Sequence, residues 1–127
     1  MQINAPISIG ELLDKISILI IKEKKISDTE KNNHVKDELM FLNEALLKVI
    51  SKSEVEEFIQ RLVDINMKLW SIEDEIRDCE RKKIFDQNFI DLARSVYISN
   101  DKRSEIKLDI NNYFGSTLIE VKSYEKY

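Results

Sequence analysis

A row of seven apolar residues along the middle of the chain constrains the fold more than any other feature. The intervals between them alternate between four and three residues. This is the spacing of one face of an α-helix, and of the seam between helices that pack at a shallow angle. A helix over residues 53–83 would be about 45 Å long and would need neighbouring helices to cover its seam. The seam consists of Phe58, Leu62, Ile65, Leu69, Ile72, Ile76 and Cys79.

Two similar rows precede this seam, and both indicate amphipathic helices. The first contains Leu12, Leu13, Ile16, Leu19 and Ile20, and the second contains Val35, Leu39, Leu42, Leu46 and Val49. A serine followed three residues later by a glutamate is typical of a capping box at a helix start. Such pairs predict three starts, at Ser8 with Glu11, Ser27 with Glu30 and Ser53 with Glu56.

A fourth helix is predicted over residues 86–114, with a kink at residues 99–101, where turn-favouring side chains follow one another. Asp86 is a suitable N-cap, and Phe85 and Ile90 are placed to form a hydrophobic staple across it. Gly115 is a natural C-terminal cap.

Turn residues are too rare in this chain for an all-β fold. The 127 residues include two glycines and one proline, whereas sandwiches and barrels draw on such residues at every turn. The sequence therefore predicts an all-α fold, an antiparallel bundle of about four helices in a single domain, residues 1–127. We expect residues 1–6 and 117–124 to be short extended segments, which could pair with each other.

Charge and composition exclude several classes of function. The net charge is −4 and basic residues are interspersed with acidic ones, so we expect no nucleic-acid partner. The most apolar run, residues 16–21, is far shorter than the roughly 20 residues that span a bilayer, and the N-terminus lacks a signal-peptide pattern. A single cysteine, Cys79, excludes an intrachain disulfide. We therefore expect a cytoplasmic protein with no membrane association.

The sequence predicts no metal site and no cofactor. The lone histidine, His34, lies in a polar stretch and cannot form a two-histidine metal face. One acidic pattern matches the metal-binding motif of an enzyme family. Glu54 and Glu57, followed by Glu75 and Asp78, fit the motif of the all-α nucleoside triphosphate pyrophosphatases, whose two halves lie on packed helices and share magnesium. Here both halves fall on one predicted helix, with about 27 Å between the second and third acids. This hydrolase is a remote alternative.

Polar residues interrupt the core-facing row of the fourth predicted helix. Two of these polar residues are the cations Arg103 and Lys107. Burying them would cost several kcal/mol unless carboxylates pair with them. Candidate partners are Glu73, Asp101 and Asp14. A milder polar row beside the long seam runs through Asn66, Trp70, Glu73 and Arg77. The interrupted row is Phe89, Ala93, Val96, Asn100, Arg103, Lys107, Ile110 and Phe114.

Two interpretations of this polar stripe stay open. In the first, its charges form an interhelical ion-pair network that fixes the register of the helices. In the second, the stripe lines a cleft that binds an anion, with Glu73 as acceptor or general base. The ligand-binding residues of this hypothesis are Glu73, Arg77, Arg94, Tyr97, Asn100, Asp101, Arg103 and Lys107. A secondary polar cluster on the first helix comprises Glu11, Asp14 and Lys15.

Three parts of the chain carry a family resemblance. They are residues 7–16 (ISIGELLDKI), residues 69–77 (LWSIEDEIR), and residues 89–103 together with 115–124. These stretches resemble a family of small helical bacterial proteins known as a domain of unknown function. The resemblance implies no particular activity. The signature residues that it implies are Glu11, Asp14, Lys15, Trp70, Glu73, Arg77, Arg94, Tyr97, Asn100, Asp101 and Arg103.

Two classes of function follow from these patterns. We favour a non-catalytic helical interaction or accessory protein that forms a homo-oligomer, with a dimer as the simplest form and another protein as a candidate partner. The reason is that the long helix with the seven-residue seam is expected to extend beyond the helices of its own chain that could cover it. The alternative is a protein or enzyme that binds a small anion between the third and fourth helices, such as a nucleotide, a sugar phosphate or a dicarboxylate.

Overall fold

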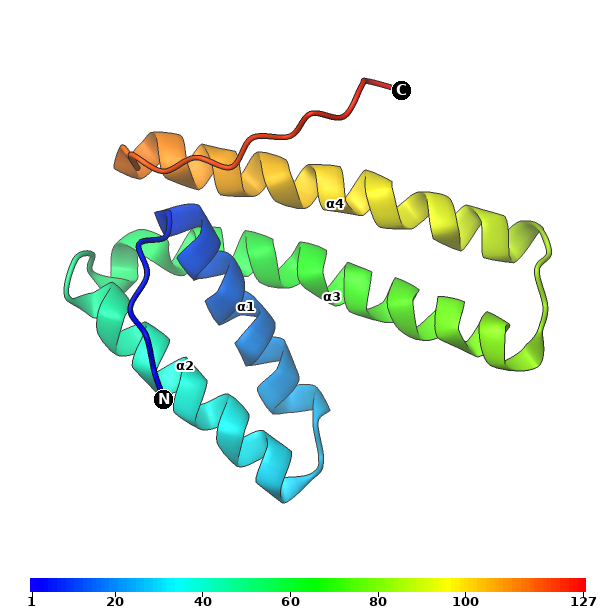
Figure 1. The fold of residues 1–127 in the computed structure, drawn as a ribbon, viewed down its shortest axis with the longest axis horizontal. Coiled ribbons are helices and arrows are strands. Elements are labelled where there is room, and N and C mark those ends of the chain that lie inside the picture. Colours follow the sequence, from blue (N-terminus) through cyan, green and yellow to red (C-terminus); the bar gives the residue numbers. More distant parts are fainter.

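The computed structural model describes the whole chain, residues 1–127, and consists of four α-helices without a strand. They are α1 (Ile9–Lys25), α2 (Thr29–Leu47), α3 (Lys52–Lys82) and α4 (Gln87–Phe114). The predicted all-α fold is confirmed. The helices form two antiparallel hairpins, α1–α2 and α3–α4, and the first crosses one half of the second obliquely (Figure 1). Helix α1 packs on each of the other three helices, whereas α2 packs mainly on α1.

The α3–α4 hairpin is the longer of the two, and its far end projects beyond the α1–α2 hairpin (Figure 1). We call this end the hairpin tip and define it as residues 73–98, because none of these residues is fully buried. Elsewhere on α3 the predicted seam is the buried face, with Leu62, Ile65, Leu69 and Ile72 in the core. The seam therefore continues past the point at which α1 covers it.

Local hydrogen bonds explain where the helices begin and end. As predicted, the Ser8 hydroxyl accepts from the Glu11 amide at 3.1 Å and the Asp86 carboxylate accepts from the Phe89 amide at 3.2 Å. Gly115 ends α4 in the left-handed conformation, with φ of 66°. Both side chains of the expected staple across Asp86 are half exposed, and Phe85 lies edge-on to Phe89 instead.

Two predicted helix starts were wrong by one or two residues. Helix α2 is capped by Asp28 rather than Ser27, because the Asp28 carboxylate accepts from the Lys31 amide at 2.8 Å. Helix α3 begins after Ser51, whose backbone N–H donates to Glu54 at 3.1 Å, and not at Ser53. The fully buried Val55 follows in the first turn of α3, on the face that packs into the core.

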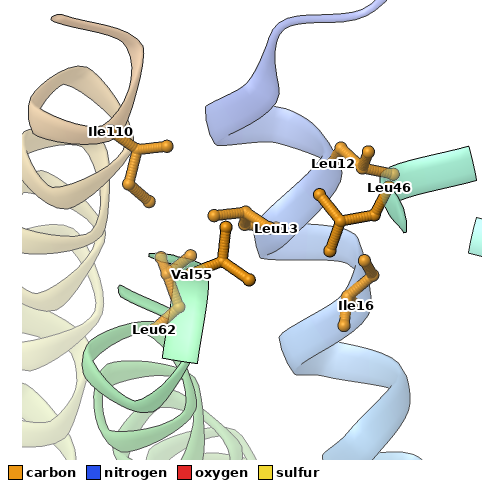
Figure 2. Close-up of a cluster of buried hydrophobic side chains, with 7 residues drawn as sticks. All are labelled: Leu12, Leu13, Ile16, Leu46, Val55, Leu62 and Ile110. Carbon is orange, nitrogen blue, oxygen red and sulfur yellow. The ribbon is translucent and has the colours of Figure 1, made fainter. Parts of the chain in front are cut away.

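The core lies where α1 meets the other helices. Leu13 of α1 is fully buried and points toward Val55 and Leu62 of α3 and Ile110 of α4 (Figure 2). On its other side α1 packs on Leu46 of α2 (Figure 2). Burying one such leucine contributes about 1.5–3 kcal/mol. The core is therefore concentrated around the first two turns of α1.

Helices α1 and α4 approach each other most closely at Gly10. A Cβ atom at this position would lie 2.5 Å from the Lys107 carbonyl oxygen and 2.8 Å from Asn111 Oδ1. The Gly10 amide donates to that same Asn111 oxygen at 2.7 Å. Only a residue without a side chain permits this contact, which fixes the register of α1 against α4.

The two ends of the chain do not pair, so that prediction was wrong. Neither segment forms a strand. The N-terminal residues lie at the α1–α2 end of the molecule, and the C-terminal segment runs back along α4 (Figure 1). Side chains of α4 anchor the C-terminal segment, since Asp101 accepts from the Tyr127 hydroxyl at 2.7 Å. Helix α4 itself runs through residues 99–101 without a break.

Candidate functional site

A buried carboxylate lies at the centre of the contact between α1, α3 and α4. Asp14 of α1 is 1% exposed. Arg103 of α4 binds it with two nitrogens, Nε to Oδ1 at 2.9 Å and Nη2 to Oδ2. The Asn66 amide of α3 donates to Oδ1 at 3.0 Å. A bidentate guanidinium with a further donor is the arrangement that best compensates a buried carboxylate.

Ser17 completes this arrangement one turn further along α1. Its hydroxyl donates to the Asp14 carbonyl oxygen at 2.6 Å and accepts from the Asn66 amide at 2.8 Å. Asn66 thus bridges two residues on the same face of α1. Ser17 and Asn66 are both buried, so three helices are joined here by hydrogen bonds rather than by apolar contact.

A second cation, which is buried, lies one turn along α4 from the half-buried Arg103. Lys107 is 7% exposed, and its Nζ lies 2.8 Å from a Glu11 oxygen and 2.6 Å from a Glu120 oxygen. Lys122 pairs with the other oxygen of Glu120 at 2.9 Å. The hydrogen bonds from Lys107 and then Lys122 lower the pKa of Glu120 to about 2. Burial lowers the pKa of Lys107, but the two carboxylates outweigh this effect and raise the pKa overall.

The structure joins the two predicted clusters into one network. Glu11 and Asp14 of the secondary cluster hold the two cations of the stripe, Lys107 and Arg103. Of the three proposed carboxylate partners, Asp14 is the one that meets a stripe cation. Lys15 of the same cluster is exposed and lies outside the network.

The other predicted residues have different surroundings. Glu73 pairs with Arg77 on the surface of α3, and Asp101 accepts from Tyr127. Tyr97 packs edge-on against Tyr127 with the ring centres 5.3 Å apart. Arg94 is exposed beside Tyr97, and its pKa is raised by a hydrogen bond with that residue. The predicted residues therefore do not converge on one pocket.

Four network residues were missing from the predicted site: Asn66, Ser17, Glu120 and Lys122. Asn66 belongs to the milder polar row of α3, so a polar residue next to the seam was the available signal. Ser17 is one helical turn from Asp14, where a hydroxyl can bond back to the helix carbonyls. Glu120 lies in a segment without helical periodicity, and no sequence pattern connects it to Lys107.

Two clefts share Arg103 and Asn100 as a common wall. The first has a volume of about 500 Å³ and lies between α1, α3 and α4, beside Trp70. The second has a volume of about 250 Å³ and is lined only by polar residues, among them Glu11, Lys107 and Glu120. A third cleft of about 810 Å³ lies between α4 and the C-terminal segment, where Tyr97, Tyr124 and Tyr127 line it.

The acidic pattern of the pyrophosphatases does not form a site. Glu54, Glu57, Glu75 and Asp78 all belong to the uninterrupted helix α3. At 1.5 Å per residue the second and third of them are about 27 Å apart along the helix, so they cannot bind one ion. No group of three or more histidine, cysteine, aspartate or glutamate side chains is arranged to hold a metal.

None of the four helices has an apolar stretch long enough to cross a membrane. No protein-family model, curated protein or solved structure matches the chain.

Proposed function

We propose that this protein is a non-catalytic helical interaction protein that assembles as a homodimer through its hairpin tip. The supporting observation is the surface of the single chain. Its solvent-accessible area is 9130 Å², whereas a compact monomer of 15.0 kDa exposes about 7,000 Å². The extended ends and the hairpin tip are exposed parts of the chain that lie outside the packed core (Figure 1). A standard interface removes about 800 Å² from each partner, which the excess readily supplies.

The chemistry of the hairpin tip also favours a partner. Ile84, Phe85 and Ile90 are 47%, 53% and 47% exposed. The seam residues Ile76 and Cys79 are only half-buried, because two helices cannot enclose a seam by themselves. A third and a fourth helix packed against the hairpin tip would bury the seam residues of α3 and the exposed apolar residues at the tip.

A second copy of the chain is the partner that fits this surface. In a twofold dimer the same patch lies on both sides of the interface, and the apolar rows of two hairpins would complete a four-helix arrangement. The charges of the tip do not oppose such a contact, since Asp78 already pairs with Lys82 at 2.8 Å and Glu80 with Lys83 at 2.9 Å.

The polar stripe supports a structural role in preference to anion binding. Arg103 and Lys107 are both paired with carboxylates of the same chain. An anion would have to displace those carboxylates or enter beside them. We accordingly favour the ion-pair interpretation of the stripe and a non-catalytic function. We also propose a cytoplasmic location, because the lone Cys79 cannot form an intrachain disulfide.

The molar mass in solution tests this proposal. We expect sedimentation equilibrium or light scattering to give twice the chain mass of 15.0 kDa. Phe85→Glu should convert the dimer to a monomer, because it places a charge within the apolar patch. Phe41→Glu is the matched control, since Phe41 is 50% exposed on α2, away from the tip.

Two results would contradict the proposal. One is a monomeric wild-type protein at all concentrations. The other is a dimer that Phe41→Glu disrupts and Phe85→Glu leaves intact, which would place the interface on α2. Circular dichroism of both variants confirms that a change in mass does not reflect unfolding.

A further inference from the structure

The cleft beside Trp70 has at its floor the side-chain carbonyl oxygen of Asn66, which has no hydrogen-bond partner in the protein. Asn66 is 6% exposed, and its amide nitrogen donates to both Asp14 and Ser17. The carboxylate of Asp14 can only accept, so this bond fixes which side of the amide is nitrogen. The carbonyl oxygen on the opposite side accepts no hydrogen bond from the protein. It is also not sealed in the core, where Ser99 Oγ is the one unpartnered buried atom. It therefore faces the cleft that Asn66 lines.

Two residues of α4 present further unused groups to the same cleft. The Nε and Nη2 nitrogens of Arg103 donate hydrogen bonds to Asp14, which leaves its Nη1 nitrogen without a protein partner. The half-buried Asn100 side chain lines the cleft and makes no hydrogen bond within the protein. An amide both donates and accepts. The cleft thus offers an acceptor, a donor and one group that can act as either.

The charge of the cleft disfavours an anion. The carboxylates of Asp14, Glu73 and Asp74 outnumber the guanidinium groups of Arg77 and Arg103 around it. A purely apolar ligand is equally unsuitable, because it would leave the polar groups of the floor without hydrogen-bond partners. The suitable ligand is neutral and carries both donors and acceptors.

The walls favour a ligand with a flat face. Trp70 is half-buried at the cleft, and Ile18, Ile21 and Leu69 supply an apolar wall. Flat aromatic ligands such as nucleobases bind by stacking on aromatic side chains. The volume of about 500 Å³ lies within the range of small-molecule sites.

We propose that this cleft binds a nucleoside, with the base against Trp70 and its polar edge toward Asn66, Asn100 and Arg103. A nucleobase combines a flat apolar face with adjacent donors and acceptors on one edge. The ribose hydroxyls lie at the rim, where the Glu73 carboxylate accepts from them. The ligand is a free nucleoside and not a polynucleotide, because the chain has a net charge of −4. The floor residues Asn66, Asn100 and Arg103 lie outside the hairpin tip, whereas Glu73, Asp74 and Arg77 at the rim belong to it.

A titration followed by nuclear magnetic resonance tests the site directly. Trp70 is the single tryptophan of the chain, so its indole N–H signal reports on the cleft without ambiguity. The probes are adenosine, guanosine, cytidine and uridine, each added to the full-length protein up to millimolar concentration. Ribose alone and a short oligothymidylate are added in separate titrations. We expect a saturable shift of the Trp70 indole signal with at least one nucleoside and none with ribose.

Asn100→Ala is the diagnostic variant. Its side chain makes no hydrogen bond in the protein and alanine favours the helix, so the fold should persist. Loss of one ligand hydrogen bond should weaken nucleoside binding by about three- to tenfold. Asn112→Ala, an exposed change on the same helix, should leave the affinity unchanged. The proposal is overturned by a flat response to all four nucleosides, by an equal response to ribose, by binding of the oligonucleotide alone, or by wild-type affinity in Asn100→Ala.

Discussion

Arg103 and Asp14 lie 89 residues apart in the sequence, yet they form a bidentate ion pair between α4 and α1 in which the carboxylate is 1% exposed and the guanidinium side chain 28% exposed. The pair has one charge in the interior and the other at its edge. Removing the outer partner would leave a buried carboxylate with Asn66 as its sole remaining side-chain donor.

The Arg103→Leu substitution should therefore destabilise the protein by about 3–5 kcal/mol, because it leaves the charge of Asp14 uncompensated. Urea unfolding followed by circular dichroism measures the effect. The double variant Asp14→Leu with Arg103→Leu should recover much of the loss, since replacing both charges with apolar groups removes the unpaired carboxylate. A single-variant loss below about 1 kcal/mol would mean that the pair is not structural.

Glu120 should make attachment of the C-terminal segment dependent on pH. Its pKa is about 2 in the folded protein against an ordinary value of 4.5, because Lys107 and Lys122 bind the ionised form. A lowered folded pKa gives stabilisation that is present above 4.5 and lost as pH falls toward 2. Because the side chain is 36% exposed, the contribution should be at most about 1 kcal/mol. The carboxyl resonance of Glu120 should titrate near pH 2, and Glu120→Gln should weaken the attachment of the segment at neutral pH. A titration midpoint near 4.5 would contradict this prediction.

The two glycines should respond to alanine for different reasons. Gly10→Ala should cost about 1–3 kcal/mol, because its methyl group would overlap the Lys107 carbonyl and Asn111 and force α1 away from α4. Gly115→Ala meets no neighbouring atom, and its cost of about 1–2 kcal/mol comes from the left-handed backbone alone. Thermal unfolding gives both values. Only Gly10→Ala should also shift the amide resonances of α1, and unchanged α1 resonances would argue against the close approach.

Alanine substitutions at the start of α2 should distinguish its two candidate caps. Asp28→Ala should cost about 1 kcal/mol because the Lys31 amide loses its acceptor. Ser27→Ala should be nearly neutral, since Ser27 is exposed and makes no capping bond. Comparing the two unfolding midpoints measures the difference. Equal losses would indicate that both residues cap the helix.

The sequence contains enough information to predict the helices but not all of their partners. Alternation of four and three places Leu62, Ile65, Leu69 and Ile72 on one face, and all four are buried. Periodicity could not decide between overlapping caps. Ser51 and Ser53 both precede a glutamate by three residues, and the structure places the cap at Ser51, whose backbone N–H donates to Glu54.

The same limit applies to the polar stripe. Its two cations were predictable because they stand in an apolar row, and Asp14 was one of three candidate partners. The pairing of Lys107 with Glu120 was not predictable, because it depends on the path of a segment that has no repeating pattern. A charged residue in an apolar row predicts that an oppositely charged partner exists, but the tertiary fold determines which residue that partner is.

Because α1 packs on each of the other three helices, its contacts are complete only after α4 has been synthesised. Its contacts with α4 join residues about one hundred positions apart, Gly10 with Asn111 among them. The α3–α4 hairpin has far shorter connections and can form early, whereas long-range contacts slow folding. As the chain leaves the ribosome, Asp14 remains hydrated until Arg103 has been added. Completion of α4 is therefore the event that closes the core around the N-terminal helix.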